Sequence, residues 1–275
     1  MRKFSIKKIS ERYRYSLILL KELVKTDFKL RYEGSVLGIV WSALKPLLLF
    51  SVMYMVFVHF LKFGAGIPFF AVSLLLAIVL WSFFQETTAQ GMRAITGNGS
   101  ILRKINIPKY VLVVSSSMSA LINLGINLVI VLIFALINGV YFTPYAFLII
   151  PIIIELYVFS LAVSMILSAL YVKFKDIGHI WDVIMQAGYF ATPIIYPLSM
   201  ITAMSPIAAK ALMMSPMAQM IQDARWAVVY QETDTVWNLF NFVPYMFIPI
   251  VIVIIIAIIG TLYFRKSSKH FTELV

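Results

Sequence analysis

Six long apolar stretches, each long enough to cross a lipid bilayer, dominate this sequence of 275 residues. They cover about residues 36–61, 68–91, 110–137, 145–171, 177–201 and 242–264. A helix needs about 20 apolar residues to cross the hydrocarbon core, and backbone amides inside lipid must pair within their own segment. Because the short alternating segments of a β-barrel are not seen, the sequence predicts an all-α membrane protein with six transmembrane helices.

The distribution of Lys and Arg predicts the orientation of the chain. Charged residues make up only 13% of the sequence, and the net charge is +11. Most of the 23 Lys and Arg residues lie before residue 36, in 93–109, at 173–175 and after 264, which share one side if there are six spans. The positive-inside rule then places both termini in the cytoplasm. We therefore interpret the positive charge as topology and contact with anionic lipid, not as nucleic-acid binding.

The sequence offers little chemistry of its own. It contains no cysteine and three scattered histidines, so disulfides, thiolate catalysis and a metal cluster are not expected. It also has no phosphate-binding loop and no paired-carboxylate or nucleophile motif. We expect a transport protein without a cofactor, driven by an ion gradient or by a partner that hydrolyses nucleotide.

Residues 1–35 have the pattern of an amphipathic helix at the membrane surface. Apolar residues recur at helical spacing from Ile9 to Val24, and basic residues occupy much of the remaining positions. Lys25, Lys29 and Arg31 are the basic residues closest to the first span, where lipid headgroups would attract them. No signal peptide is expected here.

The segment 205–236 is too apolar for an ordinary loop and too short to cross the membrane. Ser205-Pro206 and Ser215-Pro216 each predict a helix start, with serine as the N-cap and proline at the first helical position. Two interpretations stay open: a re-entrant helical hairpin on the exterior side, or two helices lying flat at the interface.

Four charged residues, Lys45, Glu86, Glu155 and Asp182, lie inside the expected spans. Lys45 is on a stripe with Gly38, Trp41 and Ser42. It could line a hydrated path and contact substrate, pair with Glu86, or extend its amine to the headgroups.

Glu155, near the middle of the fourth span, is expected to face the bundle, protonated or hydrogen-bonded to another helix, which keeps a proton-driven transporter as an alternative. A polar stripe on the third span, Ser116, Ser119, Asn123 and Asn127, favours hydrogen bonds between helices. His179 and Asp182 are interpreted as a local pair.

Several motifs in order resemble one transporter family. They are Tyr32, Ser35, Leu37-Gly38, Trp41 and Pro46, then the segments 98–108, 175–177 and 192–197, and then Ser215-Pro216 and Arg225. Together they resemble the ABC-2-type permeases that export polysaccharides, O-antigens and teichoic acids. Ser215 departs from the family, which often has asparagine there, and Lys45 is not a recognised feature of it.

The resemblance implies a half-transporter. Two copies would form the channel as a homodimer, and two copies of a separate cytoplasmic ATPase, which binds ATP and magnesium, would drive it. A coupling helix near 96–108 would contact the ATPase, with Ser100 or Asn98 as its cap. Its contact residues would be Ser100, Ile101, Leu102, Arg103, Lys104 and Ile105. Without the resemblance, Arg103 and Lys104 would be interpreted as topology charges.

The resemblance also suggests a channel and a gate. It places the first and fifth spans near the dimer interface, so the channel candidates are Trp41, Ser42, Lys45, Tyr54, Trp81, Phe84, Tyr189 and Tyr196. Aromatic belts at the membrane surfaces are the alternative explanation for the rings. Pro193 and Pro197 must break or kink the fifth span, as an exterior gate or as a static kink.

The expected protein is the permease subunit of an ATP-driven exporter of a lipid-linked cell-envelope glycan in the bacterial cytoplasmic membrane. It would comprise a cytoplasmic interface helix (1–35), a transmembrane domain (36–264) and a cytoplasmic tail (265–275). An ABC-2 exporter of a drug or simple lipid, a proton-driven transporter and a membrane scaffold are the alternatives.

Overall fold

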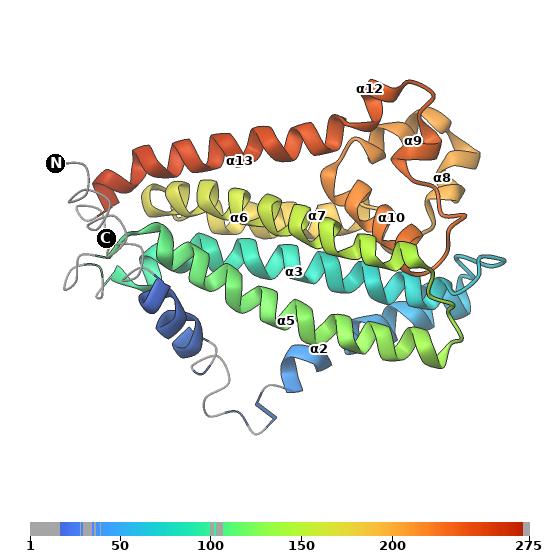
Figure 1. The fold of residues 1–275 in the computed structure, drawn as a ribbon, viewed down its shortest axis with the longest axis horizontal. Coiled ribbons are helices and arrows are strands. Elements are labelled where there is room, and N and C mark those ends of the chain that lie inside the picture. The colour runs from blue at the N-terminus through green and yellow to red at the C-terminus, as the bar shows by residue number, and fades with distance from the viewer. Residues whose placement is uncertain are drawn as a thin grey trace.

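The computed structural model describes residues 17–27, 29, 35, 37–38, 40–99, 102 and 107–271. Every regular element in these ranges is a helix, which confirms the all-α prediction. The long helices run side by side, and the short helices α8, α9 and α12 gather at one end of the bundle (Figure 1). The helical residues 17–27 and the last turns of the chain lie at the opposite end (Figure 1).

Five helices among the described residues are long and apolar enough to cross a membrane. The first combines α2 (Val40–Met53) with the π-helical η1 (Tyr54–Phe60). The others are α3 (Phe70–Gly97), α5 (Tyr110–Ile137), α6 (Ile149–Lys173) extended by the 3-10 turn η2 (Pro144–Leu148), and α13 (Ile248–Ser267), which η3 (Ser268–His270) follows. The chain is therefore a multi-pass membrane protein.

The stretch expected as the fifth span is not one continuous helix. Helix α7 (Ile177–Ala191) has 15 residues, about 22 Å at 1.5 Å per residue, which is shorter than the hydrocarbon core. Residues 192–197 are not helical, and α8 (Leu198–Met204) follows. Pro193 and Pro197 explain the break, because proline lacks the N–H that a helix needs. The predicted break or kink at these two prolines is therefore confirmed, whereas this stretch is not among the five candidate spans of the described residues.

Four helices lie between α8 and α13. They are α9 (Pro206–Met213), α10 (Pro216–Val228), α11 (Val236–Leu239) and α12 (Val243–Met246). Ser205 caps α9 as expected, since its hydroxyl accepts a hydrogen bond from the Ala208 amide at 3.3 Å. Ser215 stands at the N-cap position of α10 but makes no such side-chain bond. Helix α10 is buried along most of its length and packs against α3, α6 and α13, so it does not lie flat on a surface.

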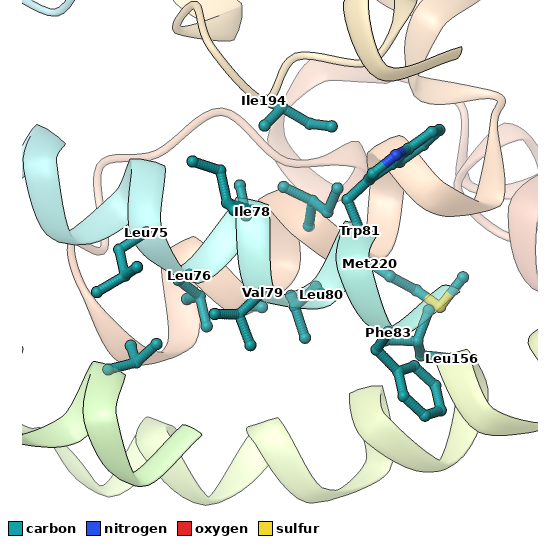
Figure 2. Packing of buried hydrophobic residues seen from close by; sticks show 14 of the residues in the cluster. Leu75, Leu76, Ile78, Val79, Leu80, Trp81, Phe83, Leu156, Ile194 and Met220 are labelled. Atoms are coloured by element: carbon teal, nitrogen blue, oxygen red, sulfur yellow. The ribbon is translucent and has the colours of Figure 1, made fainter. Parts of the chain in front are cut away.

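Helix α3 is the centre of the bundle. In its most apolar 18-residue window 78% of residues are buried, against 11% to 33% in the other four candidate spans. Its side chains pack against residues from other elements, including Leu156 of α6, Met220 of α10 and Ile194 (Figure 2). Helix α3 therefore contacts protein on nearly all sides.

Small residues let two pairs of helices approach closely. A Cβ atom on Gly91 of α3 would lie 2.6 Å from the Ser164 Cβ of α6. A Cβ atom on Gly260 of α13 would lie 2.6 Å from the backbone oxygen of Ala162, also on α6. Close backbone contact through small residues is a usual way for membrane helices to associate. Helix α6 is thus fixed between α3 and α13.

A second apolar cluster joins segments that are far apart in sequence. Leu102, Phe264 and Phe271 are buried in it, and Leu23 of the helical segment 17–27 packs against it. The Lys109 ammonium donates a 2.6 Å hydrogen bond to the Ser268 carbonyl, which ties the start of α5 to the end of α13. This end of the bundle therefore holds the N-terminal helix and the C-terminal residues together.

Candidate functional site

A cavity with many polar side chains in its wall lies between α2, α3 and α5. Its volume is about 790 Å³. Polar or charged side chains make up much of its wall: Ser35, Ser42, Lys45, Ser82, Gln85, Glu86, Gln90, Asn123 and Asn127. Polar groups in this number are costly within a membrane helix bundle unless they pair or face water. The cavity is therefore the first candidate for a functional site.

Helix α2 presents the expected stripe to this cavity. Trp41, Ser42 and Lys45 all line it, whereas Gly38 does not. The indole of Trp41 is 38% exposed. The Asn127 amide of α5 donates a 3.1 Å hydrogen bond to the Ser42 carbonyl, so α2 is held to the wall by its backbone. The helical spacing thus brought the three side chains together as predicted.

Glu86 of α3 is held by amide donors. The Asn123 Nδ2 of α5 donates to Glu86 Oε1 at 2.7 Å, and the Gln90 Nε2 donates to the same oxygen at 2.9 Å. Asn123 and Asn127 thus confirm the expected hydrogen bonds between helices. The other two residues of the stripe differ from the expectation, because the Ser116 and Ser119 hydroxyls donate to carbonyls of their own helix.

Lys45 and Glu86 share the cavity, and the Lys45 side chain is exposed. The hydrogen bonds given above for the Glu86 carboxylate come from amides, which leaves pairing with Lys45 as a prediction. A lysine that faces an open polar cavity can keep its ammonium hydrated. The placement favours a hydrated path over an ammonium extended to the headgroups.

The other aromatic candidates lie elsewhere. Trp81 and Phe84 are buried core residues, and the Phe84 ring stacks on Phe159 at 5.2 Å between centroids. Tyr189 packs edge-on against Trp81 at 6.1 Å. Tyr54 is exposed on η1, and Tyr196 donates a 3.1 Å hydrogen bond to the Ala191 carbonyl. None of these five rings lines the polar cavity, so within the described residues the stripe on α2 supplies the candidates that do.

A buried acidic cluster joins α6 to α10. The Gln219 Nε2 donates to Asp223 Oδ2 at 2.6 Å and lies 3.5 Å from Glu155 Oε2. Glu155 therefore faces the bundle and bonds to another helix, as expected. Burial raises the pKa of Asp223 to about 6, although hydrogen bonds from Gln219 and Trp237 oppose the rise. Sequence analysis missed Asp223 and Gln219, because α10 looked like an exterior segment.

Arg225 is the most deeply buried cation among the described residues, with 3% of its surface exposed. Its guanidinium donates to the carbonyls of Ser73, Pro193 and Ile194 at 3.2, 2.7 and 2.6 Å. Burial lowers the pKa of Arg225 to about 10, so the side chain stays charged at neutral pH. It also lines a cavity of about 240 Å³ beside α8. Arg225 thus joins α10 to α3 and to the break after α7.

Comparison with known proteins agrees with this architecture. The profile of the ABC-2 type transporter family matches residues 18–229, which is most of the chain. The chain belongs to this family. An O-antigen export system permease protein of Myxococcus xanthus is 30% identical over 229 residues, which cover 82% of this chain and 85% of the relative. A protein of the same name from Klebsiella pneumoniae is 26% identical over 264 residues, which cover 95% and 96%.

The coupling segment expected for an ABC-2 permease is described only in part. Ser100, Ile101, Arg103, Lys104 and Ile105 lie outside the described residues. Leu102 is 6% exposed and packs inside this chain, in the cluster with Phe264 and Phe271. Its burial favours anchoring of the segment over direct contact with a partner.

Further predicted residues of the permease can be placed. The Asn98 side chain donates to the Ala94 carbonyl at 2.9 Å, and the Asn98 carbonyl accepts a 3.1 Å hydrogen bond from the Leu102 amide, so Asn98 ends α3 and also stands where the next helical turn begins. Lys25 and Lys29 are exposed, whereas Arg31 lies outside the described residues. His179 and Asp182 are both exposed on α7.

Proposed function

We propose that this ABC-2 permease is the membrane subunit of an ATP-driven exporter for a lipid-linked cell-envelope polysaccharide or teichoic acid. The observation that carries the proposal is the cavity of about 790 Å³ between α2, α3 and α5, with a lysine, a glutamate and several amides in its wall. These side chains can form hydrogen bonds with a hydroxyl-rich or phosphorylated headgroup. Polar and charged groups at membrane depth are otherwise energetically costly. The relatives named as O-antigen export permeases support the same class of cargo.

The chain is proposed to work as a homodimer. The first span has only 11% of its most apolar window buried, and its cavity is open along one side. Helix α7 also exposes Ile180, Val183 and Ile184. A second copy against α2 and α7 would enclose the cavity and turn it into a path between the two chains.

A separate cytoplasmic ATPase is proposed to supply the energy, with ATP and magnesium bound on that subunit. It would contact the segment near 96–108, which Leu102 anchors to the cluster at that end of the bundle. Because the N-terminal helix and α13 reach the same cluster, movement of the segment would be transmitted to both.

The proposed topology has both termini in the cytoplasm of a bacterial cell and six crossings of its cytoplasmic membrane. Helices α7 and α8 would together make the broken fifth crossing, and α9 and α10 would be the exterior re-entrant pair. The lipid-linked headgroup would enter beside Lys25, Lys29 and Arg31 and leave near α9 and α10. Irregular backbone at membrane depth is tolerated where protein buries it, and residues 192–195 of the break are buried.

Stimulation of the ATPase tests the cargo. The permease and its ATPase would be reconstituted together, and hydrolysis measured with lipid-linked glycan, with the lipid carrier alone and with free glycan. We expect the lipid-linked glycan to stimulate most, and Lys45→Ala to reduce that stimulation without changing basal hydrolysis. Equal rates with all three additions would contradict the proposal.

Export of a drug or simple lipid is the second candidate. A separate apolar cavity of about 600 Å³, lined by residues such as Leu132, Phe142 and Phe147, could hold a hydrocarbon chain. Stimulation by a simple lipid or a hydrophobic drug, with none by lipid-linked glycan, would favour it. Transport that needs a proton gradient and no ATPase would instead favour a proton-driven transporter.

A further inference from the structure

The break after α7 (residues 192–197) lacks a backbone donor that a continuous helix would have, because proline has no N–H. In a continuous helix the Pro193 carbonyl would accept from the N–H of residue 197, but that residue is proline and has none. The next carbonyl, that of Ile194, belongs to the same non-helical segment. Residues 192–195 are buried, and a buried carbonyl without a donor is costly.

Arg225 supplies the missing donors. One terminal nitrogen of its guanidinium bonds to the Pro193 carbonyl at 2.7 Å, and the other bonds to the Ile194 carbonyl at 2.6 Å. The Nε atom bonds to the Ser73 carbonyl of α3 at 3.2 Å. The planar guanidinium can satisfy three carbonyls at once, which lysine and glutamine cannot do with the same geometry. A single side chain thus replaces helical hydrogen bonds at the break and ties it to α3.

The segment 192–197, which Arg225 ties to α3, also contributes side chains to the apolar core. Ile194 and Ile195 are 0% and 2% exposed and belong to the main apolar cluster. Ile194 lies on the same side of α3 as Ile78 and Trp81 (Figure 2). Arg225 also borders the cavity of about 240 Å³, which Glu232 and Asp234 line as well.

We propose that Arg225 is a positioning residue that holds the break at 192–197 shut, with Ile194 and Ile195 seated against α3, and that this segment moves when the clamp is released. The inference goes beyond the proposed function, because it identifies the moving element whatever the cargo.

A single engineered thiol tests the clamp, because the chain has no cysteine of its own. Ile195→Cys would be introduced into the full chain, assembled with its ATPase in membrane vesicles, and the rate of reaction with N-ethylmaleimide measured. This reagent crosses membranes, so the result does not depend on orientation. With Arg225 present we expect slow reaction. Arg225→Gln should raise the rate about tenfold or more, since losing one charge-assisted hydrogen bond shifts a local equilibrium by about that factor.

Two matched variants separate a clamp from a general structural role. Leu156→Cys, on α6 and 0% exposed, should stay unreactive in both backgrounds. Pro197→Ala restores the N–H that the Pro193 carbonyl lacks, so in this background Arg225→Gln should raise the Ile195→Cys rate much less. Arg225→Lys should give an intermediate rate.

Three results would overturn the proposal. They are an unchanged Ile195→Cys rate in Arg225→Gln, an equal rise at Leu156→Cys, and failure of Arg225→Gln to accumulate both with and without Pro197→Ala. The last result would mean that the whole fold needs Arg225 for something that a restored donor cannot replace. Because the labelling requires no transport, its outcome is independent of the cargo experiment.

Discussion

Asn123 of α5 donates a 2.7 Å hydrogen bond to Glu86 of α3 at the wall of the polar cavity. This bond joins two spans through side chains that would each be costly in lipid alone. Asn123→Leu should therefore lower the stability of the purified permease by about 1–3 kcal/mol, the usual cost of removing a partner from a buried polar group. The measurement is thermal unfolding followed by tryptophan fluorescence in detergent.

Ile122→Leu is the matched control for this prediction. Ile122 is the neighbouring residue on α5 and is 43% exposed, so its change should alter stability by less than about 0.5 kcal/mol. Equal stability of the two variants would show that the Asn123 bond contributes little to the bundle.

Exchanging the charges of Lys45 and Glu86 distinguishes pairing from contact with water or substrate. We expect Lys45→Glu and Glu86→Lys each to abolish export, and the double variant to remain inactive. The reason is that a lysine at position 86 cannot accept the hydrogen bonds that Asn123 and Gln90 donate. Recovery of surface glycan in cells that carry the double variant would instead support a direct ion pair.

The contact between Gly260 and Ala162 predicts an asymmetric response to added methyl groups. Gly260→Ala would place a Cβ 2.6 Å from a backbone oxygen that cannot move freely, so it should destabilise the permease by about 1–3 kcal/mol. A Cβ atom on Gly125 of α5 would meet no packing neighbour within 4 Å, so Gly125→Ala should be neutral or stabilising by up to about 1 kcal/mol. Thermal unfolding of both variants checks the contrast, and equal midpoints would contradict it.

Asp223 predicts a dependence of stability on pH. Burial raises its pKa from 3.8 to about 6, so the fold favours the protonated carboxyl. The contribution of this group to stability is full below pH 3.8 and is lost as the pH rises through about 6. The total change is on the order of 3 kcal/mol. Asp223→Asn should remove this part of the slope between pH 4 and pH 7, which unfolding midpoints of the two proteins would measure. An identical slope in both would place the titration elsewhere.

Substitutions of Leu102 and Ile105 should distinguish two roles within the segment near 96–108: anchoring to this chain and contact with the ATPase. Leu102 is buried within the chain, so Leu102→Ala should lower the stability of the permease alone by about 2–5 kcal/mol. The family resemblance gives Ile105 a contact with the ATPase, so Ile105→Asp should reduce retention of the ATPase during purification. Co-purification measures the second effect, and normal retention would remove Ile105 from the coupling contact.

Much of the fold could be predicted because lipid limits the backbone so strongly. Apolar length alone located α3, α5, α6 and α13, and helical spacing placed Trp41, Ser42 and Lys45 in one cavity wall. The break after α7 could be predicted from Pro193 and Pro197, although apolar length alone is compatible with a continuous span. Composition reports whether a segment can cross the membrane, whereas the missing N–H groups decide whether it stays one helix.

The contacts across the bundle could not be predicted in the same way. Trp81 and Phe84 were candidates for the channel because aromatic rings suit both a sugar path and a core, and only packing distinguishes these roles. Asp223 and Gln219 were missed because the two residues lie in a short helix whose burial depends on α3, α6 and α13. Hydrogen bonds such as those of Arg225 join residues more than 30 positions apart, and a single sequence does not encode such pairs in its local pattern.

The central position of α3 has a consequence for how the protein is made. Ribosomes synthesise α3 before α5, α6 and α10, the helices that later surround it. During membrane insertion α3 must therefore first sit among lipids and then exchange them for neighbours that emerge afterwards. The packing around α3 is therefore complete only when the last third of the chain has been synthesised. A chain truncated before that third would leave α3 without these neighbours, and quality-control proteases would recognise it.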